Sequence, residues 1–204
     1  SQFTRALAFQ INASRTASYR SQSLKNVTLL GISHEYEKIR RFQYAEGRYF
    51  SPIESYQGNN VAILGHSIGR ELFPGFSPLG RRVDLGGYKA TVIGLVKKEG
   101  AGMLAGGSMG EVVLIPLNFA RNFIDPEKEQ SSPTIIARAG EDVHMQELIY
   151  DTERLMRSVR RLPPREKNNF SINRASLISR NIDQLFGVIN LAGWLIGGFS
   201  ILVG

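Results

Sequence analysis

The chain has 204 residues, of which 25 are Lys or Arg and 18 are Asp or Glu, so its formal net charge is +7, and 42% of its residues are hydrophobic. This composition excludes a disordered or collagen-like chain, and the length suits one or two compact domains. With no cysteine and only three scattered histidines, the chain cannot form disulfides or thiolate metal sites, and a histidine-rich metal site is not expected. We therefore expect no catalytic residue, no metal site and no cofactor site.

Short runs of β-prone residues between polar, glycine or proline residues predict strands. In chain order these runs are 4–13, 18–23, 26–32, 60–65, 82–85, 88–96, 111–115, 134–137 and 170–172. The Gly86-Gly87 pair between two of them is typical of a hairpin turn.

Helices are predicted at 34–42, 67–73 and 142–162, the last because its apolar residues recur every three or four positions and two prolines follow. Five glycines between residues 100 and 110 predict a mobile loop.

The last twenty residues, from Leu185 to Gly204, carry no charge. A helix rises about 1.5 Å per residue, so this stretch would span about 30 Å, which is the thickness of a bilayer's hydrocarbon core. We predict a transmembrane helix that includes Leu185, Trp194 and Gly204, and a buried helix of a soluble protein is the alternative. Because this stretch stops without a flanking charge and the chain begins without methionine, we expect it to be a piece excised from a longer membrane protein.

The residues from Gly65 to Gly69 fit the pattern G-x-S-x-G, in which serine hydrolases hold their nucleophile between a strand and a helix. Such an enzyme would use Ser67 as the nucleophile and His144 as the base, and its acid would come from Asp84, Asp125 or Asp142. Neither the alternating β-α units nor the His-Gly-Gly-Gly segment of that fold accompanies the pattern. We interpret it as a tight strand-to-helix turn and keep the hydrolase as an alternative.

Two further patterns carry little functional signal. The residues from Gly100 to Ala105 fit G-x-G-x-x-A, but a predicted strand follows in place of the helix that binds a dinucleotide pyrophosphate. The chain has no phosphate-binding loop sequence, so no ATP hydrolysis is assigned to it. The basic run 154–161 lacks aromatic residues, which argues against nucleic acid and favours a solvated helix face. Contact of the wider basic face at 154–167 with lipid headgroups or an acidic partner is the alternative.

An ordered series of short motifs resembles the periplasmic core domain of MacB/FtsX-type ABC transporter permeases. The motifs are Gly31-Ile-Ser-His-Glu-Tyr36, Gly47-Arg-Tyr-Phe50, Val61-Ala-Ile-Leu-Gly65, Leu72-Phe73, Pro78-Leu-Gly80, Val92-Ile-Gly94 and Val113-Leu-Ile-Pro116. Each motif alone is weak, but their order and spacing are specific. The segment from Asp183 to Gly204 is similar to the start of the second transmembrane helix of these permeases.

The resemblance implies an α+β, two-lobed extracytoplasmic domain that leads into a C-terminal transmembrane helix. Residues 1–30 and 134–173 would form a porter-like α+β subdomain, residues 31–133 an inserted β-rich subdomain, and residues 174–204 a stalk and the start of the membrane span. The basic residues before the span would favour the cytoplasm, but long domains cross membranes largely regardless of charge. We expect a domain of the cell inner membrane that faces the periplasm.

The implied function is a non-catalytic one, in which the domain couples cytoplasmic ATP hydrolysis to the export of a hydrophobic drug, peptide or lipoprotein. The implied partners are an ABC ATPase domain or subunit, a periplasmic adaptor, the membrane and a second permease copy in a homodimer. Two other functions stay open, namely an FtsX-like regulator that recruits a cell-wall hydrolase and a membrane-anchored serine hydrolase that uses Ser67.

Overall fold

The computed structural model describes residues 4–98, 109–125, 133–139 and 144–173, and these fall into two compact units. The first unit holds the described residues up to Leu148, and the second begins at Ile149.

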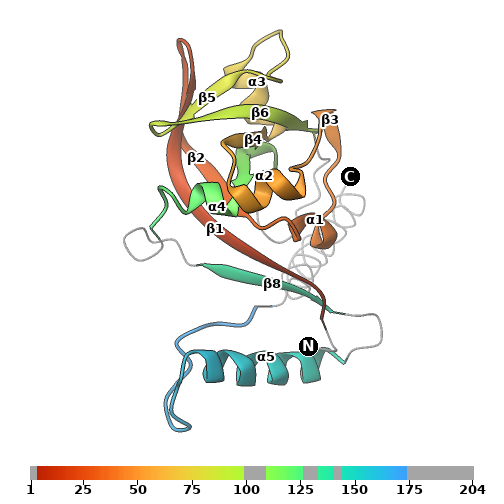
Figure 1. Ribbon diagram of the computed structural model, residues 1–204, viewed down its shortest axis with the longest axis vertical. Coiled ribbons are helices and arrows are strands. Elements are labelled where there is room, and N and C mark those ends of the chain that lie inside the picture. The colour runs from red at the N-terminus through yellow and green to blue at the C-terminus, as the bar shows by residue number, and fades with distance from the viewer. Residues whose placement is uncertain (1–3, 99–108, 126–132, 140–143, 174–204) are drawn as a thin grey trace, which may run out of the picture. The chain divides into compact units, whose positions relative to one another are not determined.

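Eight strands of the first unit join in one sheet (Figure 1). They are β1 (Thr4–Tyr19), β2 (Gln22–Ile32), β3 (Tyr44–Gly47), β4 (Val61–Leu64), β5 (Arg82–Leu85), β6 (Tyr88–Val96), β7 (Val112–Pro116) and β8 (Thr134–Ala139). Six of the strands close into a ring in the order β1-β2-β7-β4-β6-β5, because β1 pairs with both β2 and β5. The pairs β2–β7 and β4–β6 are parallel, and the other pairs in the sheet are antiparallel.

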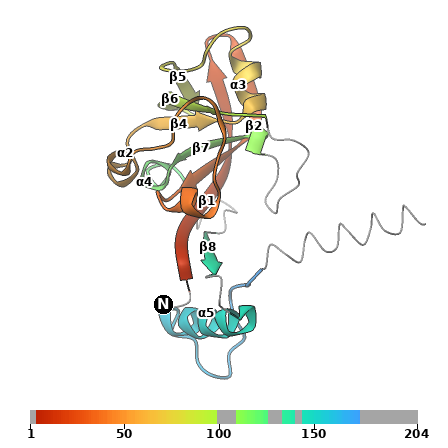
Figure 2. The same ribbon diagram turned by 90° about the vertical axis from the view of Figure 1, so that its right-hand side faces the viewer.

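Short helices connect these strands and cover the ring (Figure 2). In the first unit they are α1 (Tyr36–Ile39), α2 (Pro52–Gln57), α3 (His66–Leu72), the 3-10 turn η1 (Met109–Glu111) and α4 (Leu117–Ala120). The α2 and α4 helices lie side by side, and the Asn118 side-chain amide donates a hydrogen bond to the Tyr56 carbonyl oxygen at 2.8 Å.

The core consists of two hydrophobic clusters, one on each face of the central strands. In β4, Ala62 and Leu64 belong to the first cluster, and Val61 and Ile63 belong to the second. Successive side chains of a strand point to opposite faces, so a strand buried on both faces reads as a continuous apolar run. This explains why the run at 60–65 was predicted correctly as a buried strand and the run at 111–115 as a strand.

Strand β1 is long enough to take part in two pairings. Its N-terminal half pairs with β8, from Thr4 opposite Ala139 to Gln10 opposite Thr134, and its C-terminal half pairs with β2. The β1–β8 ribbon therefore extends out of the ring (Figure 2). The division of the chain into a porter-like part and an inserted part stays a prediction, to which this pairing adds the observation that β1 connects the ribbon with the ring.

The second unit contains most of helix α5 (Met145–Val159) and the loop that follows it. The loop folds back on the helix because Arg157 donates to the carbonyl oxygens of Pro163 and Glu166 at 2.6 and 3.0 Å. The side chain of Asn168 donates to Glu153 at 2.6 Å. Helix α5 ends at Val159, earlier than the predicted end at 162, because Arg161 has a positive φ of 52° and the Leu162 amide donates to the Arg157 carbonyl oxygen at 3.0 Å.

Several predicted elements differ from the structure. The runs 4–13 and 18–23 are not separate strands, because β1 continues to Tyr19 and turns at Arg20-Ser21 into β2. The helix predicted at 34–42 shrinks to α1, since Arg40 has an extended backbone, and no strand forms at 170–172. The helices α2 and α4 and the strand β3 were not predicted.

Two predictions fall largely on residues outside the described ranges. These are the loop at 100–110, of which only the last two residues are described, and the transmembrane segment with Leu185, Trp194 and Gly204. Within the described ranges, no helix combines the length and the hydropathy that a membrane crossing requires.

Candidate functional site

Ser67 does not lie in the geometry of a hydrolase nucleophile. It is part of α3, and its φ is not positive, because among the described non-glycine residues only Arg20, Asn26 and Arg161 have positive φ. The nucleophile of a hydrolase elbow sits instead on a strained turn. In the described part of the chain, no hydrogen bond joins Ser67 to His66 or to the exposed His144, and Asp142 lies outside that part.

The two glycines of the G-x-S-x-G pattern have packing roles. A Cβ built on Gly65 would lie 2.5 Å from the Gly110 carbonyl oxygen, and one built on Gly69 would overlap the Leu95 side chain. At Gly65 the close atoms belong to the backbone of η1, so only glycine fits there, whereas a side chain at Gly69 would require the Leu95 side chain to move. This supports the interpretation of the pattern as a tight turn.

His34 and Asp84 each make local contacts of their own. The His34 ring packs beside Tyr49 and Tyr56, with ring centroids 5.8 and 6.2 Å apart, and the Asp84 carboxylate accepts a hydrogen bond from the Gly87 amide in the β5–β6 turn. Among the described residues, no group of three His, Asp or Glu side chains is placed to hold a metal ion.

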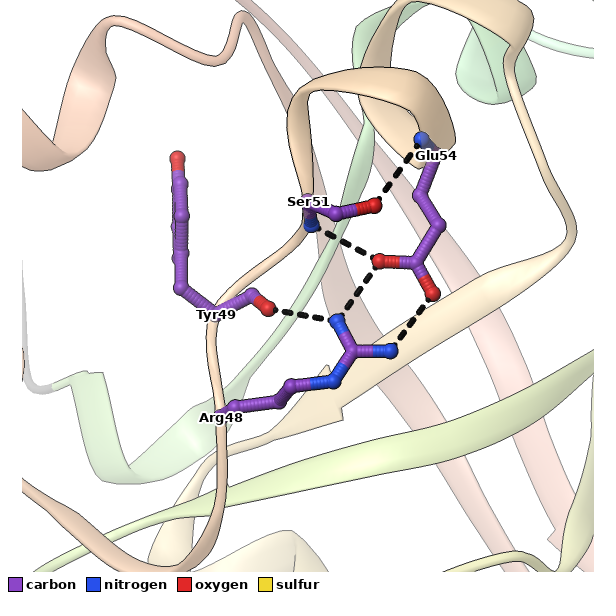
Figure 3. A network of polar contacts seen from close by, with 4 residues as sticks. All are labelled: Arg48, Tyr49, Ser51 and Glu54. Atoms are coloured by element: carbon purple, nitrogen blue, oxygen red, sulfur yellow. Dashed lines mark hydrogen bonds and ion pairs between the residues drawn. The ribbon is translucent and has the colours of Figure 1, made fainter.

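The Gly47-Arg-Tyr-Phe50 motif and the helix after it form a rigid polar network (Figure 3). The Arg48 guanidinium donates to both Glu54 carboxylate oxygens, with Nη1–Oε2 at 2.7 Å and Nη2–Oε1 at 2.8 Å, and to the Tyr49 carbonyl oxygen at 2.9 Å. Ser51 caps α2, because its Oγ accepts from the Glu54 amide at 3.2 Å while its own amide donates to Glu54 Oε2 at 2.7 Å. One carboxylate thus ties the motif to the first turn of α2.

This network changes the electrostatics of Glu54. The Arg48 hydrogen bonds, helped by those from Ser51, lower the pKa of Glu54 to about 2, against the opposing effect of partial burial. Behind the network, burial raises the pKa of the Tyr49 phenol, whose ring packs against Phe50 and Phe42 in the second core cluster. The carboxylate is therefore ionised, and the phenol is neutral, at ordinary pH.

The outer face of α2 exposes two large side chains, Ile53 at 65% and Tyr56 at 62%. The Tyr56 hydroxyl is held by Glu35 Oε1 at 2.9 Å, so this side chain is both exposed and fixed. Neither α2 nor the Arg48–Glu54 pair was predicted from the sequence. The signal was present, because Ser51-Pro52-x-Glu54 is a capping box with proline at the first helical position.

Comparison with protein families and individual proteins gives a consistent result. The family described as MacB-like periplasmic core domain matches residues 2–155. A macrolide export ATP-binding/permease protein, MacB, of Bdellovibrio bacteriovorus is 27% identical over 192 residues, which cover 87% of this chain but 28% of that protein. An uncharacterized ABC transporter permease, YknZ, of Bacillus subtilis is 33% identical over 73 residues, which cover 36% of this chain and 18% of that protein. The chain thus spans less than a third of the length of these relatives.

Solved structures share the fold at low sequence identity. The periplasmic region of MacB from Actinobacillus actinomycetemcomitans aligns with a TM-score of 0.71 and 19% identity, covering 90% of this chain and 78% of that one. The extracellular domain of the ABC-type transporter YknZ from Gram-positive bacteria aligns with a TM-score of 0.61 and 22% identity, covering 77% of this chain and 76% of that one.

Proposed function

Since this chain belongs to the family of MacB-like periplasmic core domains, we propose that it couples ATP hydrolysis in the cytoplasm to export across the membrane by moving as a rigid body. Its family membership, over residues 2–155, is the observation that carries the proposal. The domain itself performs no chemical step. It works in the cell inner membrane on the periplasmic side, with an ABC ATPase domain or subunit as the source of free energy.

The geometry of the β1–β8 ribbon supports this mechanical role. Thr4, where the described chain enters the first unit, is opposite Ala139 at the end of β8. Two paired strands with hydrogen bonds between them move together, so a displacement applied to either one reaches the ring through β1. The ring can follow this displacement as one body, because a close-packed core resists deformation.

The cargo and the further partners belong to the same proposal. We expect a hydrophobic drug, peptide or lipoprotein as cargo, and a periplasmic adaptor and a second permease copy as partners. The names of relatives support export of such molecules by those proteins, since one is a macrolide exporter and another a probable syringafactin exporter.

The test uses the protein as the cell makes it, in proteoliposomes with its ATPase. Four glycines inserted after Ala139 would loosen the connection of the ribbon to the chain beyond it. We expect ATP turnover to persist and ATP-driven export of a macrolide to fall about tenfold. The control is the same insertion between Gly86 and Gly87, in the exposed β5–β6 turn, where a Cβ on Gly87 would meet nothing within 4 Å.

Equal export by both insertion variants would overturn the mechanical role. Adduct formation between a fluorophosphonate probe and Ser67, lost in Ser67→Ala, would instead support the hydrolase alternative. A cell-wall hydrolase that co-purifies with the protein and loses activity without it would support the FtsX-like alternative.

A further inference from the structure

The tip of the β1–β2 hairpin holds an arginine in a backbone conformation that arginine rarely adopts. Arg20 and Ser21 connect the paired residues Tyr19 and Gln22, and φ of Arg20 is 52°. Two-residue hairpin turns that need positive φ normally use glycine, asparagine or aspartate. Residues held in such conformations are concentrated at functional sites. Glycine, asparagine or aspartate would form the same turn with less strain, so the turn itself does not require an arginine at position 20.

This arginine stacks on an aromatic cluster built from two separate segments. The Arg20 guanidinium carbon lies 5.4 Å from the centroid of the Tyr19 ring. The Tyr19 ring lies 4.4 Å from Phe73 and 6.2 Å from Phe76, which follow helix α3. Phe73 is 2% exposed and anchors the cluster, whereas Phe76 is 44% exposed. We call Tyr19, Arg20 and Phe76 the hairpin-tip patch.

The charge around the patch is positive. In the described part of the chain, Arg20 forms no ion pair, and its side chain is exposed. The segments 19–25 and 70–76 that build this end of the ring carry Arg20, Lys25 and Arg70 against one carboxylate, Glu71. A surface with a cationic surplus is complementary to an acidic one.

The composition of the patch distinguishes between two kinds of acidic partner. Tyr, Phe and Arg are enriched in the cores of protein–protein interfaces, and Tyr and Arg dominate their hot spots. Recruitment to an anionic membrane instead uses clusters of four to eight Lys or Arg. From these observations we propose that the hairpin-tip patch binds an acidic segment of a partner protein. A carboxylate of that segment pairs with Arg20, and an apolar side chain packs against Tyr19 and Phe76.

The proposal is independent of the cargo and of the coupling role, and photo-crosslinking in the intact cell tests it. Benzoylphenylalanine replaces Phe76 in one variant and Tyr88 in a control, since Tyr88 is 41% exposed on β6 and outside the patch. We expect the Phe76 probe to form an adduct with a protein segment in which Asp and Glu outnumber Lys and Arg. The probe at Tyr88 should not form this adduct.

Two substitutions separate binding from folding. Arg20→Gly suits the positive φ, so the thermal midpoint should stay equal or rise, while the adduct yield falls at least tenfold. Asn26→Gly is the matched control, because Asn26 also has positive φ, at 57°, on the same hairpin. This control should leave the adduct yield unchanged. Arg20→Asn should lower the adduct yield as Arg20→Gly does, because asparagine also tolerates the positive φ of the turn.

Several results would overturn the proposal. These are an adduct with phospholipid, an adduct with a second copy of this protein, an adduct with a basic or neutral segment, or no adduct at all. A yield that survives Arg20→Gly in a folded protein would also overturn it.

Discussion

Gly47 shows how one position can fix the start of a motif. Its φ is +78°, and a Cβ built on it would lie 2.8 Å from the Gly94 Cα and 2.9 Å from a Leu79 methyl carbon. Both the backbone conformation and the close approach of β6 therefore require glycine. This contact places Arg48 where its guanidinium can reach Glu54.

Alanine at position 47 should destabilise the fold in two ways, through the left-handed backbone conformation and through close contacts of the new Cβ. Gly47→Ala should lower the free energy of unfolding by about 3 kcal/mol, since overpacking adds to a left-handed penalty of roughly 1 kcal/mol. Gly75→Ala is the matched control, because Gly75 has φ +83° and nothing within 4 Å of a built Cβ, so it should lose about 1 kcal/mol. Urea unfolding measures both, and equal losses would show that crowding at Gly47 is relieved by small shifts.

The Arg48–Glu54 pair predicts a pH dependence. The pKa of Glu54 is about 2 in the folded chain, below its ordinary value of 4.5, so the pair stabilises the fold above pH 4.5 and loses this effect as the pH falls toward 2. Because Arg48 is more than half exposed and solvent screens the pair, we expect about 1 kcal/mol.

Glu54→Gln should therefore have a lower free energy of unfolding than the natural protein at pH 7. The difference in free energy between the two proteins should be smaller at pH 3. Urea unfolding at the two pH values checks this expectation. The control Glu71→Gln changes an exposed carboxylate on α3 and should behave like the natural protein at both. A difference that grew on acidification would contradict the ion-pair explanation.

At the scale of elements, the strands of the ring carry most of the buried apolar surface. Leu114 in β7 is fully buried in the second cluster opposite Ile63, whereas Ile135 in β8 is 46% exposed opposite Phe9. Leu114→Ala should cost about 3 kcal/mol because it removes packed atoms and leaves a cavity. Ile135→Ala should cost less than about 1 kcal/mol, since water already reaches its side chain. Denaturant unfolding compares them, and similar costs would mean that the ribbon is as tightly packed as the ring.

The same elements explain what the sequence could and could not predict. Continuous apolar runs and glycine turns identified β4, β5, β6 and β7, because burial on both faces and turn chemistry are local properties. The end of α1 could not be found this way. Charged residues continue the helical pattern to Phe42, but the Phe42 ring packs with Tyr36 and Tyr49 in the second cluster, and Arg40 turns extended to allow it. Tertiary packing decides that boundary.

The candidate site was also predicted only in part from the sequence. The motif that starts at Gly47 was recognisable from its residues, but the role of Arg48 depends on Glu54, six positions later. The hairpin-tip patch was not predicted, because Phe73 and Phe76 meet Tyr19 only after the ring has closed. The sequence alone does not show that Arg20 lies in a two-residue turn, because that position follows from the register between β1 and β2.

At the scale of the whole molecule, stability should differ between the ring and the ribbon. Amides of β4 and β7 have neighbours on both sides, while β8 pairs with β1 alone among the described strands. Native-state hydrogen exchange should therefore show β4 and β7 opening only with global unfolding and β8 opening earlier. Slower exchange in β8 than in β7 would contradict this order.

The parallel pairing of β2 with β7 also has a consequence for biosynthesis. Thr28 meets Val112, so the ring cannot close before the ribosome has released β7. Until then β2 has an unpaired edge and an apolar surface, which are the features that make nascent chains aggregate. A chaperone that covers this surface should therefore be needed until β7 is available for pairing, and its binding to the newly made domain should fall once the chain through Pro116 can fold.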